Sequence, residues 1–269
     1  MYKKNPNTIL LEGGNWAEYK NPAYNKDKSD FFFSIMQRLK YDAACLGLQE
    51  LAFGARHYEE LSNGSPAILV SNVEALVDGE KTGVGQPYFI QEVGGVKVGV
   101  FGLVGEEQGS KRRSRRHKKE VKTDFNRDYI ILDSVQTARR MVTEMREKGC
   151  EVIILLAQLA PSGVNKVIRT VEGIDVAILG YKPDLRKTPR KTGETIVVRT
   201  GFRGQFFGLL ELEVDPSGKI VNFSGLSMPV HDKLVKDPAI RKLIINYKKT
   251  IADFQKDEET EGRVRSKMH

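Results

Sequence analysis

Groups that bind transition metals or form disulfides are scarce in this sequence. Its 269 residues include 4 histidines and 2 cysteines. The cysteines, Cys45 and Cys150, lie in the apolar segments DAACLGL and GCEVIILL, so we expect buried free thiols rather than a disulfide. No haem-attachment motif and no cysteine pair with zinc-ligand spacing is present. We expect the four histidines at the surface: His57, His117, His231 and His269.

Long hydrophobic runs are also missing. No run reaches the ~18 apolar residues that a membrane-spanning helix needs, and stretches such as Glu151–Leu156 have the length of buried strands. The apolar segment Thr8–Leu11 is too short for the core of a signal peptide, and the charged Glu12 follows it. The sequence therefore predicts no membrane span and shows no signal peptide.

Much of the net charge of +8 comes from one basic run, SKRRSRRHKK, at Ser110–Lys119. One interpretation is a solvated loop whose charges repel one another. The other is a surface that binds a polyanion such as nucleic acid, with steep salt dependence. Base stacking is not indicated, because no aromatic residues interleave with the charges. The candidate anion-binding residues are Lys111, Arg112, Arg113, Arg115, Arg116, Lys118 and Lys119.

Apolar runs alternate with amphipathic segments along most of the chain. We expect strands at Thr8–Leu11, Asp42–Gly47, Ala67–Asn72, Tyr88–Val93, Val96–Val104, Val152–Leu156, Asp175–Leu179, Thr195–Thr200, Gln205–Val214 and Ile220–Leu226. We expect helices at Asp30–Leu39 (capped by Ser29 or Asp30), Ala55–Leu61, Asp133–Lys148, Val164–Thr170 and Asp237–Gln255. This order favours a layered α/β/α sandwich with mixed sheets. We expect one domain over 1–255, with 256–269 a charged tail or linker.

Several motifs stand in a specific order over residues 8–226. They are TILLEGGN, YDAACLGLQE, VSNV, VGGVKVGVFGL, EVIILLAQ, GIDVAILGYKP and TGFRGQFFGLLELEVD. Together they resemble the 5′-nucleotidase branch of the calcineurin-like metallophosphoesterases. The resemblance implies a four-layered α/β/β/α sandwich. No segment here matches the family's first strand, so either the sequence is a piece of a longer protein or the fold has lost that strand. It also implies a hydrolase that uses two divalent metal ions.

The positions that match the family's metal-binding motifs carry poor ligands. The resemblance assigns these vestigial positions to Asn15, Leu48, Gln49, Gln158, Tyr181 and Pro183. Glu50 matches the glutamate that ends the second motif and is not a metal ligand in the family. Carboxylates and imidazoles suit a pair of dications, whereas leucine and proline side chains offer no ligand atom. We therefore expect no metal, no other cofactor and no catalytic residue, in a pseudoenzyme that serves in binding, structure or assembly.

Two alternatives stay open beside the pseudoenzyme. The first is an active phosphoesterase with a rebuilt or incomplete site that uses Glu12, Asn15, Glu50, Gln158 and Asp184. The second is a polyanion-binding module that acts through residues 111–119. The resemblance also implies a protein partner or a fused module, such as the multihaem cytochromes that follow similar bacterial domains. If the fold has lost the family's first strand, self-association is favoured, because a neighbouring strand edge then needs covering. The family suggests a periplasmic or extracellular location.

Overall fold

The structure is a computed structural model, and it describes residues 7–17, 22–54, 56–77, 79–105, 129–181, 185–201, 204–231 and 233–251. The chain divides into two compact units, Met1–Val230 and His231–His269. The basic run at 110–119 and the tail at 256–269 lie outside the described residues, so the predictions made for them stay predictions. No helix of the described residues is long and apolar enough to cross a membrane.

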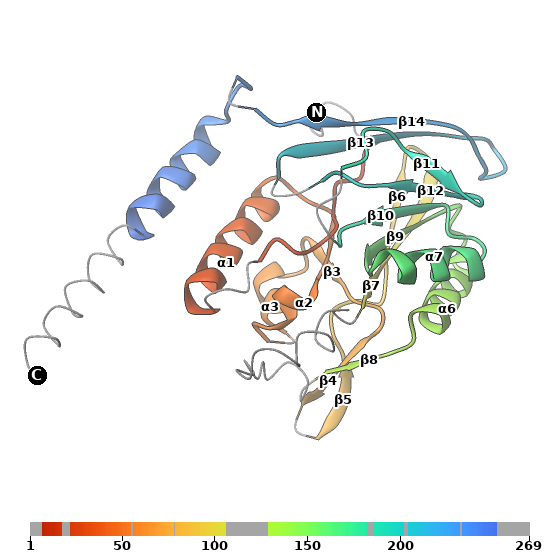
Figure 1. Cartoon of the computed structure of the whole chain (residues 1–269), viewed down its shortest axis with the longest axis horizontal. Coiled ribbons are helices and arrows are strands. Elements are labelled where there is room, and N and C mark those ends of the chain that lie inside the picture. The colour runs from red at the N-terminus through yellow and green to blue at the C-terminus, as the bar shows by residue number, and fades with distance from the viewer. Residues whose placement is uncertain are drawn as a thin grey trace, which may run out of the picture. The chain divides into compact units, whose positions relative to one another are not determined.

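The first unit contains the helices α1 (Pro22–Arg38), α2 (Leu48–Leu51), α3 (His57–Ser62), α6 (Ser134–Glu147) and α7 (Pro161–Thr170). A sheet of six strands has the order β11 (Arg190–Thr192), β12 (Thr195–Val198), β10 (Val176–Leu179), β9 (Val152–Gln158), β7 (Val96–Val104) and β6 (Phe89–Val93). Its four central strands are parallel, and its outer strands β11 and β6 are antiparallel to their neighbours. The sheet is therefore mixed, as the sequence predicts (Figure 1).

Three smaller sheets complete this unit. One is parallel, in the order β1 (Leu11–Glu12), β2 (Ala43–Cys45) and β3 (Ala67–Leu69). Another is antiparallel, in the order β5 (Glu80–Gly83), β4 (Val73–Val77) and β8 (Tyr129–Ile131). The last is the hairpin of β13 (Phe206–Val214) and β14 (Ile220–Pro229).

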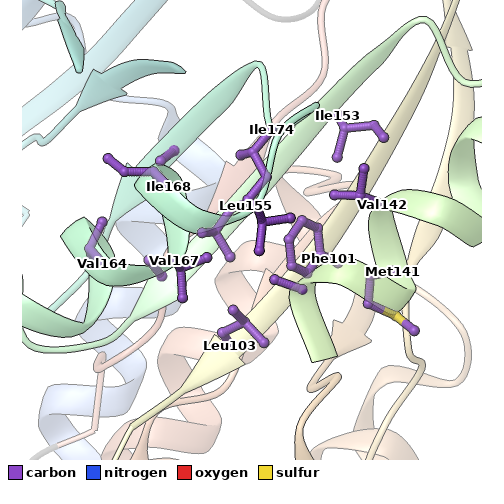
Figure 2. Close-up of a cluster of buried hydrophobic side chains, with 14 of the residues drawn as sticks. Phe101, Leu103, Met141, Val142, Ile153, Leu155, Val164, Val167, Ile168 and Ile174 are labelled. Atoms are coloured by element: carbon purple, nitrogen blue, oxygen red, sulfur yellow. The ribbon is translucent and has the colours of Figure 1, made fainter. Parts of the chain in front are cut away.

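Alternate residues of each buried strand enter different layers of the core, because successive side chains of a strand point to opposite faces. On β7, Phe101 and Leu103 join α6 and α7 in one buried cluster, which Figure 2 shows between the strands and the two helices. Val98 and Val100 point the other way, into a second cluster shared with β2 and β3. A third cluster lies between the β1–β3 sheet and the helices α1, α2 and α3. The arrangement is the predicted α/β/β/α sandwich.

The long amphipathic helix α6 follows its sequence pattern closely. Asp133 caps it, since its side chain accepts hydrogen bonds from the backbone nitrogens of Val135 (2.9 Å) and Gln136 (2.8 Å). The buried residues recur at the spacing of one helical face: Thr137, Ala138, Met141, Val142 and Met145. Both cysteines are buried free thiols, as expected.

The predicted start of α1 is wrong. The helix begins at Pro22 rather than near Asp30, which agrees with the preference of proline for the first turn. Ser29 is not a cap: it is buried inside the helix, and its hydroxyl lies 2.5 Å from the Tyr58 hydroxyl. The polar stretch before Asp30 looks like a loop in sequence, yet the helix extends through it.

The second unit contains one helix among its described residues, at 238–251. Its first turn is capped by Asp237, which accepts hydrogen bonds from the backbone nitrogens of Ala239 (2.9 Å) and Ile240 (3.1 Å). The helix predicted at Asp237–Gln255 is confirmed over its described residues, with Pro238 in its first turn.

Candidate functional site

The carboxyl ends of the parallel strands bring the sequence-predicted site positions to one edge of the sandwich. Asn15 follows β1, Leu48 and Gln49 open α2 after β2, and Gln158 is the last residue of β9. Tyr181 lies two residues beyond β10. Pro183 and its neighbours Lys182 and Asp184 lie outside the described residues.

At this edge, Gln158 connects the six-stranded sheet, which contains β9, to the three-stranded sheet of β1, β2 and β3. Its side-chain nitrogen Nε2 donates a hydrogen bond to the backbone oxygen of Gly13, which follows β1. The side chain is only 2% exposed, and a Cβ added at Gly14 would lie 2.9 Å from Nε2 and 3.2 Å from Cγ of Gln158. A glycine at position 14 thus lets the chain pass close to Gln158. The other amide atom, Oε1, accepts no hydrogen bond from the described residues.

Gly13 and Gly180 allow β1 and β10 to approach each other behind Gln158. A Cβ at Gly13 would lie 3.4 Å from the Cα of Gly180. A Cβ at Gly180 would clash with both Nε2 of Gln158 and the backbone of Gly13. Protein atoms therefore fill the space between the ends of β1, β9 and β10. Gly180 stands directly after the predicted strand Asp175–Leu179, and Gly13 lies two residues beyond the predicted strand Thr8–Leu11.

Hydrogen bonds to Glu50 connect the loop after β1 to the start of the short helix α2. One carboxylate oxygen accepts from the backbone nitrogen of Ala17 at 2.6 Å. The other accepts from the backbone nitrogens of Gly47 at 2.8 Å and Asn15 at 3.1 Å. The side chain is fully buried. Burial raises the pKa of Glu50, and the three backbone donors oppose that rise.

Asn15 lies against the same loop. Its φ of 63° places it in the left-handed region, which asparagine tolerates better than most residues. Its side-chain oxygen faces Gly47 so closely that a Cβ there would clash with it. This amide is the first of the vestigial positions, and it packs on Gly47 beside the carboxylate of Glu50.

Leu48, Gln49 and Tyr181 occupy three further vestigial positions. Leu48 packs against the apolar cluster between the β1–β3 sheet and the helices α1, α2 and α3, together with Trp16 and Tyr41. Gln49 and Tyr181 are half-buried. The carboxyl-end edge of the strands thus gathers these described positions, and Leu48 packs against the apolar cluster.

Glu12 is the other acidic residue at this edge. Its carboxylate accepts a hydrogen bond from the backbone nitrogen of Gly14 at 3.1 Å. Burial and, to a smaller extent, the nearby Glu50 carboxylate raise the pKa of Glu12 to about 7, although hydrogen bonds from Gly14 and Gly13 oppose the rise. The carboxyl group therefore changes its charge near neutral pH.

The described residues at this edge do not fit a pair of divalent metal ions. Such a centre needs several carboxylates or imidazoles around two cations about 3.5–4 Å apart. In the part of the chain that the structure describes, no three His, Cys, Asp or Glu side chains gather to hold a metal ion. Glu50 already accepts three backbone hydrogen bonds, and the orphan amide oxygen of Gln158 is uncharged.

The described histidine at position 57 is not a surface residue as expected. Its Nε2 lies 2.6 Å from Oδ1 of Asp30, and its side chain is 15% exposed. The ring also packs edge-on against Tyr58. His57 thus links α3 to α1 through Asp30.

Curated proteins of similar sequence are mainly 5′-nucleotidases. The 5′-nucleotidase of Diplobatis ommata is 22% identical over 94% of this chain and 46% of that protein. The human 5′-nucleotidase is 21% identical over 94% of this chain and 46% of that protein. The trifunctional nucleotide phosphoesterase protein YfkN of Bacillus subtilis is 26% identical over 83% of this chain and 18% of that protein. The chain spans about half the length of the 5′-nucleotidases that it matches. No family model matches the sequence.

Solved structures of similar fold agree with these relatives. The 5′-nucleotidase precursor of Thermus thermophilus superposes with a TM-score of 0.72 at 22% identity, over 91% of this chain and 50% of that chain. The calcineurin-like phosphoesterase YfkN of Bacillus subtilis gives a TM-score of 0.69 at 23% identity, over 94% of this chain and 86% of that chain. The resemblance inferred from the motifs is confirmed.

Proposed function

We propose that this chain, which has the fold of calcineurin-like phosphoesterases and 5′-nucleotidases among its relatives, is a non-catalytic member of that fold that serves in binding or assembly. The observation that carries the proposal is the hydrogen bond from Gln158 to Gly13. This contact fills the space between the strand ends with protein atoms. In the family that the motifs resemble, the two metal ions are expected at this place.

The neighbouring positions support the same proposal. Leu48 has no atom that can bind a metal, and it packs into an apolar cluster. Asn15 and Gln158 offer neutral amides in place of charged or imidazole ligands. Loss of a single metal ligand or of its hydrogen-bonded support costs about 10- to 100-fold in affinity or activity, and several positions differ here together.

The test combines metal analysis with an assay of hydrolysis. The purified protein is loaded with Mn²⁺, Zn²⁺, Co²⁺ or Mg²⁺, desalted, and analysed by mass spectrometry for bound metal. Release of phosphate from AMP and from p-nitrophenyl phosphate is measured beside the Thermus 5′-nucleotidase as a positive control. We expect less than one metal ion per chain and no hydrolysis above the buffer. Two retained ions with metal-dependent phosphate release would refute the proposal.

An active phosphoesterase with a rebuilt site is the second candidate function. Two observations favour it: the relatives are named as nucleotidases, and the orphan oxygen of Gln158 lies at the same edge as Glu12. In that case Glu12→Gln removes the metal-dependent hydrolysis, whereas Glu60→Gln, on the exposed surface of α3, leaves it unchanged. Hydrolysis that survives Glu12→Gln contradicts this rebuilt site.

Polyanion binding by residues 111–119 stays a prediction. Its test is the affinity for double-stranded DNA or heparin as a function of salt. A basic run that contacts several phosphates gives a steep fall of log affinity with log salt. Replacement of Arg112, Arg113, Arg115 and Arg116 with alanine is expected to abolish the binding, and binding that persists excludes the run.

A further inference from the structure

The helix at 238–251, drawn in blue in Figure 1, is amphipathic. Its larger apolar side chains recur at the spacing of one helical face. They are Ile240, Leu243, Ile244, Tyr247 and Ile251. Ile244 is 38% exposed and the other four are half-buried. A single helix cannot bury such a stripe by itself, so this face is suited to contact with another apolar surface.

The opposite face of the helix is basic. Residues seven positions apart lie on the same face, because they are separated by about two helical turns. Arg241 and Lys248 form one such pair, and Lys242 and Lys249 form another. No acidic residue stands within 238–251, so no carboxylate of this segment neutralises the four cations. The helix thus combines an apolar stripe with a basic face.

Two exposed apolar residues precede the helix. Leu234 is 48% exposed, and Val235 is fully exposed. Lys233 and Lys236 stand on either side of the pair. Apolar side chains beside lysines suit the boundary between the headgroups and the acyl chains of a bilayer, because a lysine reaches the headgroups while its apolar neighbour inserts.

The charge of the helix indicates which surface its apolar stripe contacts. A second copy of the helix would bring four more cations close to the first four, and like charges brought together oppose association. An anionic lipid surface offers an apolar layer for the stripe and negative headgroups for the basic face. A helix that lies in such a surface typically divides its apolar and basic residues in this way.

We propose that the segment 234–251 binds the surface of a bilayer that contains anionic phospholipids. The apolar stripe enters the boundary between headgroups and acyl chains, and the four cations of the basic face bind the lipid phosphates. The helix lies along the surface and does not cross the bilayer, because no helix of the described residues is long and apolar enough to do so.

This proposal goes beyond the proposed function, and the two can fail separately. None of the strand-end positions described above lies within 234–251. Binding to vesicles therefore needs neither metal nor hydrolysis, and the metal and phosphate assays do not depend on the vesicle assay.

The test is flotation of the full chain with lipid vesicles. One set of vesicles contains phosphatidylcholine alone, and the other contains equal parts of phosphatidylcholine and phosphatidylserine. We expect binding to the anionic vesicles to be at least about tenfold tighter, because each cation near a negative surface strengthens the attraction. Binding to the anionic vesicles should weaken as the salt concentration rises, since ions screen exposed charges.

Two adjacent isoleucines provide a matched pair of variants. Ile244 lies in the apolar stripe, whereas Ile245 lies among the four cations of the basic face. Both are exposed, at 38% and 45%, and a lysine at either position adds the same charge. Ile244→Lys should weaken binding to anionic vesicles by at least about tenfold, because a buried isoleucine is lost from the contact. Ile245→Lys should bind at least as tightly as the wild type.

The variants also separate the helix from the basic run at 110–119, which both of them leave intact. Equal binding of Ile244→Lys and the wild type to anionic vesicles would overturn the proposal, and so would a wild type that binds neither kind of vesicle. A dimer that Ile244→Lys dissolves, without vesicle binding, would assign the stripe to a second copy of the chain.

Circular dichroism shows whether each variant is folded. If Ile244→Lys does not fold, hydrogen exchange of the wild type decides. Amide hydrogens of residues 238–251 should then exchange more slowly with anionic vesicles than with phosphatidylcholine vesicles, and unchanged exchange contradicts the proposal.

Discussion

Gln158 at the end of β9 donates a hydrogen bond to the backbone oxygen of Gly13 after β1, and so joins two sheets through residues 145 positions apart in the chain. The bond lies at the edge where the parallel strands of both sheets end. In phosphoesterases that the motifs resemble, this edge would hold metal ions. Here a buried amide and a buried carboxylate hold the strand ends, and the following predictions concern their contribution to stability.

Replacement of Gln158 with alanine should destabilise the fold by about 1–3 kcal/mol, because the backbone oxygen of Gly13 loses its donor in a buried place. The measurement is unfolding by urea, followed by circular dichroism. Gln49→Ala is the control at the same edge, and since Gln49 is half-buried we expect a change under about 1 kcal/mol. Equal effects of the two substitutions would show that the link between the sheets contributes little.

Glu50→Gln should cost about 1–3 kcal/mol. The carboxylate accepts three backbone hydrogen bonds, whereas the glutamine NH₂ group cannot accept one and would face a backbone donor. The free energy of unfolding measures the loss. Glu213→Gln on the exposed face of β13 provides the control, with an expected change within about 0.5 kcal/mol. A variant as stable as the wild type would mean that the loop after β1 does not depend on Glu50.

Gly180→Ala should destabilise the protein by about 1–3 kcal/mol, as overpacking of a filled interior does. The added methyl group would meet the Gln158 amide and the backbone of Gly13, so β10 and β1 must move apart. Gly83→Ala is a matched control, because a Cβ there meets nothing within 4 Å and the backbone needs no positive φ. Similar melting temperatures for both variants would contradict the close approach.

The stability of the fold should depend on pH through Glu12. Its pKa is raised from 4.5 to about 7 in the folded state, so the folded protein binds the proton more tightly than the unfolded chain does. The stabilisation is complete below about pH 4.5 and is lost as the pH rises through about 7. We expect the free energy of unfolding to fall by about 1–3 kcal/mol over this window.

Glu12→Gln isolates this contribution. The variant should lose most of the decline between pH 4.5 and 7, and the remaining slope should come from Glu50, whose pKa is raised in the same direction. Equilibrium unfolding of both proteins at several pH values gives the comparison. Parallel curves for the wild type and the variant would show that Glu12 is not responsible.

Some parts of the site could be foreseen and others could not. The strand that ends in Gln158 is a run of apolar residues, and the prediction of β9 and of α6 beside it is confirmed. The motifs placed Asn15, Leu48 and Gln158 at strand ends, where the structure also has them. They did not reveal that Gln158 reaches Gly13 or that Glu50 binds three backbone nitrogens, because those contacts join distant segments.

Local sequence alone determined the longer strands and helices and the hairpin around Gly94 and Gly95. It did not indicate the short helix α2 or the strands β4, β5, β8 and β11. The predicted features depend on the alternation of apolar residues and on backbone preferences within a few positions. Only the tertiary structure decided that α1 extends back to Pro22, that Leu48 packs against the core, and that Gln158 reaches Gly13. Each of these three features depends on which distant part of the chain packs against the side chain. The periodicity of a short segment does not indicate that part of the chain.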